Sequence, residues 1–319
     1  MDKINWGIIG CGDVTELKSG PAFNKVKNSS LVAVMRRNAE KAEDYAQRHN
    51  VPKWYSDANL LINDEDVNAI YIATPPSSHE EYTLAAIRAG KPVYVEKPMS
   101  VNYSSAKNMK LIANEYDQKI VVAHYRRQQP LFKKIKELID SNAIGDIRLV
   151  NLNCFKKMLT KSDLSKTGIE WRVNPAVAGG GLFNDLAPHQ LDLMIYFFGD
   201  VLAANGLATN QSNLYEADDV VAGNILFKKN VMFNGSWCFT AGEHDERDLC
   251  EIIGSEGKIS FAVFGHQAIS ITRQGNTETI SFDKLMHVQQ PMIEKVVEYF
   301  LGKSDNPCNA EEGLKVMEL

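Results

Sequence analysis

The N-terminal third of the chain alternates between short apolar runs and amphipathic segments of helical length. Apolar runs such as INWGIIG, SLVAVM, VNAIYIAT and QKIVVAH are separated by segments such as AEKAEDYAQRH and YSSAKNMKLIANEY. Short β-branched runs that alternate with helices are typical of βαβ units, in which the strands pair in parallel. The pattern predicts a doubly wound parallel sheet of the Rossmann type.

The rhythm changes after about residue 131. Beyond Asp200, apolar and polar residues alternate in the runs VVAGNILF, NVMFNGSWCF, KISFAVFG and AISITR. Alternation with period two predicts a mostly antiparallel sheet with one open face. We therefore predict an α/β fold with a Rossmann domain over residues 1–123 and an α+β domain over residues 124–319. The last segment, NAEEGLKVMEL, predicts a helix whose apolar stripe, begun by Leu314 and Met317, would continue beyond residue 319.

Composition excludes several classes of protein. The net charge of -5, without a local cluster of Lys and Arg, gives no attraction to phosphate backbones or anionic membranes. No apolar stretch approaches the roughly 20 residues of a membrane span, and the N-terminal residues do not resemble a signal peptide. The cysteines are odd in number and form no C-x-x-C, which argues against a disulfide framework or a zinc cluster. We predict a cytoplasmic protein without nucleic-acid or membrane partners.

The turn after the first predicted strand carries a nucleotide-binding pattern. Gly10-x-Gly12 follows INWGIIG directly, Asp13 and Val14 open the next segment, and Thr15 replaces the usual third small residue. Glycines at these positions allow a tight turn and the close approach of a pyrophosphate. The alternative is an ordinary strand-to-helix turn, which the position of the motif in a βαβ unit makes less favourable.

The end of the second predicted strand indicates the form of the cofactor. An NAD site places a carboxylate there to bind the ribose 2′-hydroxyl, but this chain carries Arg36 and Arg37. Guanidinium groups bind a 2′-phosphate bidentately. We predict NADP(H), with NAD(H) as the alternative if Arg37 is only a solvated residue that opens a helix.

A proline-containing loop, IATPPSSH, follows the third predicted strand of the pattern. Thr74 and Pro75 lie at the carboxyl edge of the sheet, where ligands bind in such folds, and are predicted to contact the cofactor. Ser78 and Glu81 predict a capping box. His79 does not fit a metalloprotease motif and is interpreted as the start of a helix.

The stretch VYVEKPMS places Glu96 and Lys97 where another strand ends. Both are predicted to lie beside the cofactor. A lysine in a partly desolvated cleft exchanges protons near neutral pH, because burial lowers its pKa. Taken alone, such a pair is more often a surface salt bridge than a catalytic group.

A second polar constellation occurs in GGGLFNDLAPHQLD. In a helix, Asp185, His189 and Asp192 lie on one side, and an apolar face lies nearly opposite. The stripe offers acid, imidazole and acid; the alternatives are a solvated face or a core histidine satisfied by its neighbours. No further group with ligand spacing accompanies it, so no metal site is predicted.

Taken together, the Gly10-x-Gly12 turn, Glu96-Lys97-Pro98 and the Asp185-x-x-x-His189-x-x-Asp192 stripe resemble the Gfo/Idh/MocA family. The resemblance covers essentially the whole chain. It implies a Rossmann domain joined to an α/β domain whose open sheet carries oligomer contacts, and hence a homodimer or homotetramer. It also implies hydride transfer between a nicotinamide and a sugar, polyol or related carbinol.

The resemblance also implies roles for individual residues. Lys97 would interact with the reacting oxygen, His189 would be the main general acid/base, and Asp185 would bind a substrate hydroxyl. Further candidates near the substrate are Tyr125 and Arg126 at the domain junction, and Trp171 and Arg172 before the glycines. An indole or guanidinium facing a cleft suits stacking on a polyol or hydrogen bonding to it.

Two other functions remain open on the same fold. Some relatives oxidise a sugar carbon, eliminate or hydrolyse, and reduce it again, so that the nicotinamide is retained. A non-catalytic nucleotide or sugar sensor is the other alternative, because a fold alone does not give a function. The presence of Lys97, Asp185 and His189 weighs against the sensor.

Overall fold

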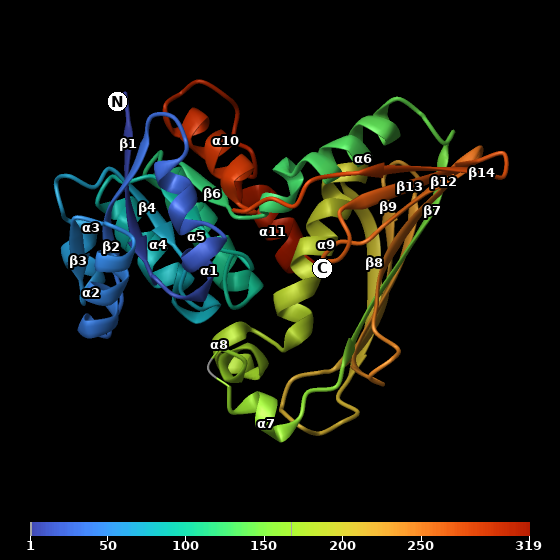
Figure 1. Ribbon diagram of the computed structural model, residues 1–319, viewed down its shortest axis with the longest axis horizontal. Helices are drawn as coiled ribbons and strands as arrows, with labels where there is room; N and C mark the ends of the chain where they lie inside the picture. Colours follow the sequence, from blue (N-terminus) through green and yellow to red (C-terminus); the bar gives the residue numbers. More distant parts are fainter. Residues whose placement is uncertain (1, 167) are drawn as a thin grey trace. The chain divides into compact units, whose positions relative to one another are not determined.

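The chain, described by a computed structural model over residues 2–166 and 168–319, forms two compact units (Figure 1). The first unit is made of two segments of the chain, the residues up to Arg126 and Leu285–Glu318. The second unit comprises Arg127–Lys284. The predicted domains, residues 1–123 and 124–319, differ from this division at the C-terminal end. Residues 285–318 return to the first unit because their apolar side chains belong to its core.

A parallel sheet forms the centre of the first unit. Its strands are β1 (Ile4–Ile9), β2 (Ser29–Met35), β3 (Lys53–Tyr55), β4 (Ala69–Ile72), β5 (Val93–Val95) and β6 (Ile120–Val122). They lie in the order β3-β2-β1-β4-β5-β6, and all neighbours pair in parallel. This confirms the predicted Rossmann sheet. The strand order reverses between β1 and β4, and ligands of such sheets bind outside the carboxyl ends of the strands at that point.

Helices lie on both faces of this sheet (Figure 1). They are α1 (Asp13–Leu17), α2 (Ala39–Arg48), α3 (Ala58–Ile62), α4 (His79–Arg88), α5 (Tyr103–Glu115), α10 (Gln290–Phe300) and α11 (Ala310–Glu318). Every residue of β4 and β5 is buried, as expected for strands covered on both sides. Asparagine side chains cap two of the helices: Asn38 accepts a main-chain N–H bond at the start of α2, and Asn102 does so at α5.

The start of α4 departs from the predicted capping box. The helix begins at His79, as predicted, but Ser78 makes no side-chain cap hydrogen bond, so the expected box with Glu81 does not form. The Ser78 hydroxyl instead donates to Thr74 Oγ1 at 2.9 Å and lies 3.1 Å from the carbonyl oxygen of Pro75. The reason is a 3-10 turn before the helix, which directs Ser78 back to the loop after β4.

The last two helices complete the first core. The ring of Phe300, on α10, lies 5.6 Å from that of Trp6, on β1. A Cβ on Gly313 would lie only 2.7 Å from a side chain of β6, so glycine permits the close approach of α11. Leu314 is buried and Met317 packs against the same core. The apolar stripe of α11 therefore packs within the first unit.

The second unit contains a mixed sheet of eight strands. They are β7 (Ile147–Lys157), β8 (Val201–Thr209), β9 (Val220–Phe227), β10 (Met232–Ala241), β11 (Arg247–Gly254), β12 (Gly257–Phe261), β13 (Ala268–Arg273) and β14 (Asn276–Ser281). Their order is β14-β13-β12-β11-β7-β10-β9-β8. The β7–β10 pair is parallel and the other pairs are antiparallel, which confirms the predicted mostly antiparallel sheet.

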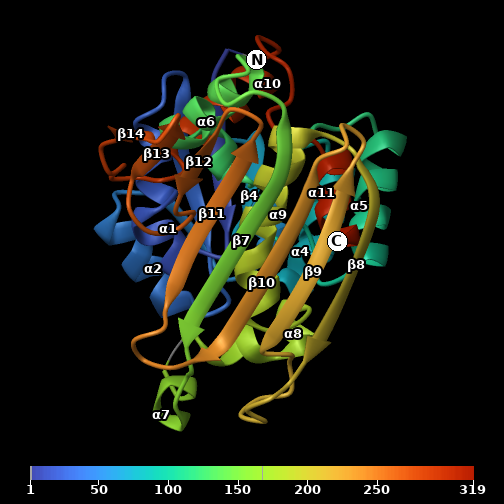
Figure 2. The same cartoon turned by 90° about the vertical axis from the view of Figure 1, so that its right-hand side faces the viewer.

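One face of this sheet is covered by helices. The helices of the unit are α6 (Pro130–Asp140), α7 (Lys161–Leu164), α8 (Pro175–Ala178) and α9 (Leu182–Phe198). Phe198 of α9 packs on Phe227 at 5.5 Å, and Phe132 of α6 packs on Phe261 at 6.2 Å. The opposite face carries no helix among the residues that the structure describes (Figure 2), which confirms the predicted open face.

Strand β8 was not identified from the sequence. Its residues, VLAANGLAT, lack a β-branched alternation, and every one after Val201 is exposed. The strand lies at the edge of the sheet and pairs with β9. Since neither face is buried, burial imposes no pattern that a sequence could reveal.

Candidate functional site

The turn after β1 lies against the loop after β4. Gly10 has a φ of +95°, and a Cβ there would lie 2.7–2.9 Å from atoms of Ala73 and Thr74. The main-chain N–H groups of Gly10 and Cys11 donate to the carbonyl oxygen of Met35 at 2.9 and 3.1 Å. Glycine is therefore required at this position by the backbone conformation and by the close approach of the neighbouring loop.

Helix α1 begins directly after Gly12, with Asp13 and Val14 in its first turn. A Cβ on Gly12 would meet no atom nearer than 3.9 Å, so the missing side chain leaves open space before the helix. Thr15 is fully buried, and its hydroxyl donates to the Gly12 carbonyl at 2.7 Å. A threonine thus fits the third position by turning inward, and the turn can accept a pyrophosphate.

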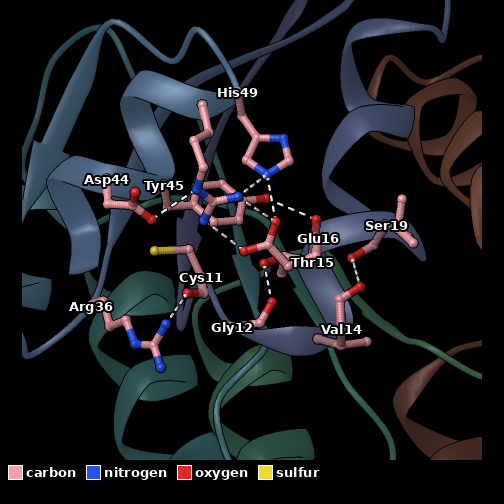
Figure 3. A network of polar contacts seen from close by, with 12 residues as sticks. Cys11, Gly12, Val14, Thr15, Glu16, Ser19, Arg36, Asp44, Tyr45 and His49 are labelled. Carbon is pink, nitrogen blue, oxygen red and sulfur yellow. Dashed lines mark hydrogen bonds and ion pairs between the residues drawn. The ribbon is translucent and has the colours of Figure 1, made fainter.

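A charged network fixes α1 to the end of α2 (Figure 3). Arg48 donates to both carboxylate oxygens of Glu16 at 2.8 and 2.9 Å, and His49 Nε2 lies 2.8 Å from the same carboxylate. The hydrogen bonds from Arg48 lower the pKa of Glu16 to about 2. Nearby, the hydroxyl of Tyr45 donates to the carbonyl oxygen of Thr15 at 2.8 Å. These contacts hold α1, and with it the glycine turn that precedes it, against the C-terminal end of α2.

The predicted phosphate-binding arginines follow β2. Arg36 is half-buried, and its Nη1 donates to the carbonyl oxygen of Cys11 at 3.3 Å, which places the guanidinium beside the glycine turn (Figure 3). Arg37 is exposed. The structure thus brings Arg36 to the turn and leaves the side chain of Arg37 in solvent.

The carboxylate of Glu96 points into the interior. Its Oε1 accepts hydrogen bonds from the hydroxyl of Tyr71 at 2.6 Å and from Gln289 Nε2 at 2.5 Å, and its Oε2 accepts the main-chain N–H of Lys97 at 3.1 Å. Glu96 is only 6% exposed, whereas Lys97 is half-buried. The Lys97–Pro98 peptide bond is cis. Glu96 therefore fixes the loop that presents Lys97.

The other candidates of the first unit lie at the same edge of its sheet. Thr74 and Pro75 follow β4 and are half-buried. Tyr125 follows β6 and is 5% exposed within the core, and the guanidinium carbon of Arg126 lies 5.6 Å from the centre of its ring. The glycine turn, Thr74, Pro75 and Lys97 thus all lie at the carboxyl edge of the sheet. Most of the Tyr125 side chain is buried in the core.

In the second unit, α9 carries the predicted acid–imidazole–acid stripe. Asp185 lies in the first turn and is half-buried, His189 is 5% exposed, and Asp192 is 1% exposed. The solvated face considered as an alternative does not describe His189 and Asp192, because both are buried. Asp185 is the accessible member of the stripe.

The polar segment before α9 meets Asp185. Arg172 Nε lies 3.3 Å from Asp185 Oδ2, and the guanidinium carbon of Arg172 lies 4.6 Å from the centre of the Trp171 ring. Arg172 also donates to the carbonyl oxygen of Gly168. The structure therefore brings together the three substrate-binding candidates Trp171, Arg172 and Asp185.

A buried ion pair inside the second unit was not anticipated from the sequence. Arg127 Nη2 lies 2.8 Å from Asp192 Oδ1, and its Nε donates to both carboxylate oxygens at 3.0 Å. Burial raises the pKa of Asp192 to about 6, while the charge of Arg127 acts in the opposite direction. The residues are 65 positions apart, so their spacing in the sequence gave no sign of the pair.

A second unanticipated feature is an aromatic ring beside His189. The ring of Phe264 lies 5.8 Å from the imidazole in an edge-to-face arrangement. Its loop is held by Asp248, whose carboxylate accepts the N–H groups of Val263, Phe264 and Gly265 at 3.0, 2.6 and 2.8 Å. The sequence showed the loop only as the continuation of an apolar run.

Neither a metal site nor a membrane span is found in the described parts of the chain. No group of three or more His, Cys, Asp or Glu side chains among residues 2–166 and 168–319 could hold a metal ion. None of the helices over the same residues is long and apolar enough to cross a bilayer.

Known proteins resemble both parts of the chain. Residues 4–124 match the family model described as "Oxidoreductase family, NAD-binding Rossmann fold", and residues 132–260 match that of the GFO/IDH/MocA C-terminal domain. "Oxidoreductase P35" of Formosa agariphila is 46% identical over 317 residues, which cover 99% of this chain and 97% of the relative. The 1,5-anhydro-D-fructose reductase of Ensifer adhaerens is 27% identical over 256 residues, 80% of this chain and 74% of the relative.

A solved structure shares the complete fold. The aldose-aldose oxidoreductase from Caulobacter crescentus, complexed with glycerol, superimposes with a TM-score of 0.86 at 21% identity. The match covers 99% of this chain and 95% of that one. At this identity the similarity establishes the fold.

Proposed function

Because this chain belongs to the Gfo/Idh/MocA family of oxidoreductases, we propose that it transfers a hydride between NADP(H) and a carbinol or carbonyl carbon of a sugar or polyol. The observation that carries the proposal is the carboxyl edge of the first sheet, where the Gly10 turn and Lys97 follow strands of the same sheet. The substrate class is supported by the names of two relatives, a reductase of 1,5-anhydro-D-fructose and an aldose-aldose oxidoreductase.

The proposed chemistry assigns a distinct task to each side chain. When bound, the nicotinamide accepts or supplies the hydride. Lys97 holds the reacting oxygen, and His189 takes the hydroxyl proton as the C–H bond breaks, or returns it in the reverse direction. His189 must lie within about 3 Å of that oxygen in the productive complex.

The remaining candidates bind the substrate. Asp185 accepts a hydrogen bond from a substrate hydroxyl, and Arg172, which already contacts this carboxylate, orients it. Trp171 offers a flat apolar surface for the C–H face of a sugar ring. Tyr125 and Arg126 are proposed as further contacts.

The proposal is tested by nicotinamide absorbance during turnover of sugars, inositols, anhydro-ketoses and aromatic diols, with NADP(H) and NAD(H) in parallel. Net conversion of added cofactor supports the dehydrogenase or reductase. Substrate conversion without net cofactor turnover would identify the cofactor-retaining enzyme. Tight cofactor binding without any substrate conversion would favour the sensor. Cytoplasmic localisation stays a prediction from the sequence.

The preference for NADP(H) rests on Arg36 and Arg37. A hydrogen bond to a charged group contributes about 1.5–3 kcal/mol, so Arg36→Ala and Arg37→Ala are each expected to raise the Kd for NADPH roughly 10- to 100-fold. The Kd for NADH should change little, because it lacks the 2′-phosphate. Titration of cofactor fluorescence measures both constants.

A matched control comes from a distant arginine. Arg148 is exposed and pairs with Asp146 on the second unit, so Arg148→Ala should leave both constants unchanged. If the unaltered protein binds NADH as tightly as NADPH, the assignment to NADP(H) is wrong.

We also propose that the open face of the second sheet binds a second copy of this chain. Leu149, Met232 and Leu226 are neighbours in register across β7, β10 and β9, with side chains on the open face. At the edge, Leu207 of β8 is 83% exposed on the same face. The sequence of β8 has no charged residue and no proline, the usual features that protect an exposed edge. The same face also carries asparagine side chains that bond to one another across the strands, Asn234 to Asn151 and Asn224 to Asn205. Exposed apolar side chains rimmed by polar ones are typical of a protein–protein contact surface.

The interface is tested by light scattering coupled to size-exclusion chromatography. We expect a dimer or tetramer that dissociates in the variant Leu207→Lys with Met232→Lys, because charges on an apolar interface must be desolvated. Leu111→Lys is the control, since Leu111 is an exposed leucine on α5 of the first unit. A monomeric unaltered protein would rule the interface out.

A further inference from the structure

The imidazole of His79 is completely buried between two loops of the first unit. Its Nε2 lies 2.7 Å from the carbonyl oxygen of Thr74, in the loop after β4. Its Nδ1 lies 3.1 and 3.3 Å from the carbonyl oxygens of Pro98 and Met99, in the loop that follows Lys97. Main-chain acceptors of both loops therefore converge on one ring.

The ring can satisfy these acceptors only through its N–H groups. A neutral imidazole carries one N–H donor and an imidazolium carries two. Burial lowers the pKa of His79, and the carbonyl oxygens of Thr74, Pro98 and Met99 act in the opposite direction. The neutral ring donates to a carbonyl of one loop while it packs against the other, and the protonated ring donates to both loops. A buried carbonyl that loses its donor destabilises the folded state, because the carbonyl stays out of water without a partner. Removing the donors of His79 therefore weakens the link between the loops, even if a side chain of similar volume fills the space.

The same contacts continue to the nucleotide turn. A Cβ on Gly10 would lie 2.8 Å from the main-chain nitrogen of Thr74, so the glycine turn and the Thr74 loop touch directly. Ser78 holds the Thr74 side chain from the other side at 2.9 Å. Through Thr74 and His79, the loops after β1, β4 and β5 form one connected support.

We propose that His79 is a positioning residue that links the Thr74 loop to the Lys97 loop and so sets the place of Lys97 relative to the nucleotide turn. The proposal rests on the catalytic role proposed for Lys97. His79 itself, being fully buried, acts through the main chain of its neighbours and touches neither substrate nor cofactor.

Amide hydrogen exchange with mass-spectrometric detection tests the link directly in the full-length protein with NADPH. In His79→Phe, which keeps the ring volume without donors, peptides covering residues 73–78 and 96–100 should exchange about tenfold faster, as expected for the loss of a hydrogen bond near 1.4 kcal/mol. His79→Gln, which keeps an amide donor, should fall between this variant and the unaltered protein.

The control is a buried residue of the same helix. Thr83 is fully buried on α4, and its Oγ1 has no hydrogen-bond partner among the described residues. Thr83→Ala loosens the packing of α4 without removing a donor from either loop, so exchange of the two peptides should stay close to that of the unaltered protein. Equal exchange in His79→Phe and Thr83→Ala would overturn the proposal.

Kinetics supply a second readout that a purely structural role would not change. His79→Phe should lower kcat roughly 10- to 100-fold, as expected for a misplaced catalytic group, with a much smaller change in the Kd for NADPH. His79→Gln should recover part of kcat. If Lys97→Met retains full turnover, the proposed function fails while the exchange result still decides the link. If Lys97→Met is inactive and His79→Phe behaves like Thr83→Ala, only the positioning role is wrong.

Discussion

Replacement of Lys97 by methionine is expected to lower kcat by roughly 10²- to 10³-fold, the usual cost of removing one donor that stabilises the charge developing on a reacting oxygen. Methionine keeps much of the length and the apolar stem of lysine but has no ammonium group to hold the reacting oxygen. The main-chain N–H of Lys97, which bonds to Glu96, is retained in the variant. The loop should therefore keep its conformation, and binding of NADPH should change little.

The measurement combines steady-state turnover on the first substrate found in the panel with fluorescence titration of NADPH. Lys107→Met is the matched control, because Lys107 is an exposed lysine on α5 of the same unit. We expect its kcat to equal that of the unaltered enzyme. A Lys97→Met variant that turns over normally would remove Lys97 from the mechanism.

The second large effect concerns stability. Asp192→Leu is expected to lower the free energy of unfolding by about 3–5 kcal/mol, because it leaves the guanidinium of Arg127 buried without its carboxylate. Arg127 and Asp192 have side chains only 3% and 1% exposed. The double variant Arg127→Met with Asp192→Leu should recover most of the loss, since no unpaired charge remains.

The two single variants should differ in their response to pH. In Arg127→Met the remaining carboxyl can take up a proton, whereas the guanidinium left in Asp192→Leu stays charged. The folded-state pKa of Asp192 is already raised by burial from 3.8 to about 6, and loss of Arg127 raises it further. A raised folded-state pKa means that the folded form binds the proton more tightly. Stability of Arg127→Met should therefore decrease as the pH rises from 5 to 8, and that of Asp192→Leu should respond much less.

Urea unfolding followed by tryptophan fluorescence measures these free energies. Asp146→Ala is the control: Asp146 and its partner Arg148 are exposed by 71% and 63%, so the change should stay within about 0.5 kcal/mol. If Asp146→Ala and Asp192→Leu lowered the free energy of unfolding equally, the buried pair would not contribute more to stability than the exposed one, and the prediction would be wrong.

The sequence predicted the architecture wherever burial imposed a period. The predicted run VVAGNILF coincides with β9 and AISITR with β13, because one side of each strand faces the core. β8 escaped detection because its residues are exposed on both sides. The packing of α10 in the first unit also could not be predicted from the sequence. An amphipathic helix has an apolar face, but its sequence does not indicate against which of two cores that face will pack.

The site shows the same limit. Gly10 was predictable because a tight turn after a buried strand requires a residue that tolerates positive φ. The pairing of Arg127 with Asp192 and the bonds of His79 join residues distant in sequence. Such contacts depend on tertiary packing, for which local spacing provides no signal. The chemical roles of Lys97, Asp185 and His189 stay proposals that rest on the resemblance.

The return of the C-terminal segment to the first unit affects how the protein matures on the ribosome. Trp6 is synthesised nearly 300 residues before Phe300, yet the two rings pack against each other. When Arg126 has emerged, all six strands of the first sheet exist, but α10 and α11 are not yet made. The nascent sheet must wait for the whole intervening unit to be translated before its core can close. During that interval the exposed apolar surface is a target for chaperones, and a ribosome that stops before α10 releases a first unit without its final cover.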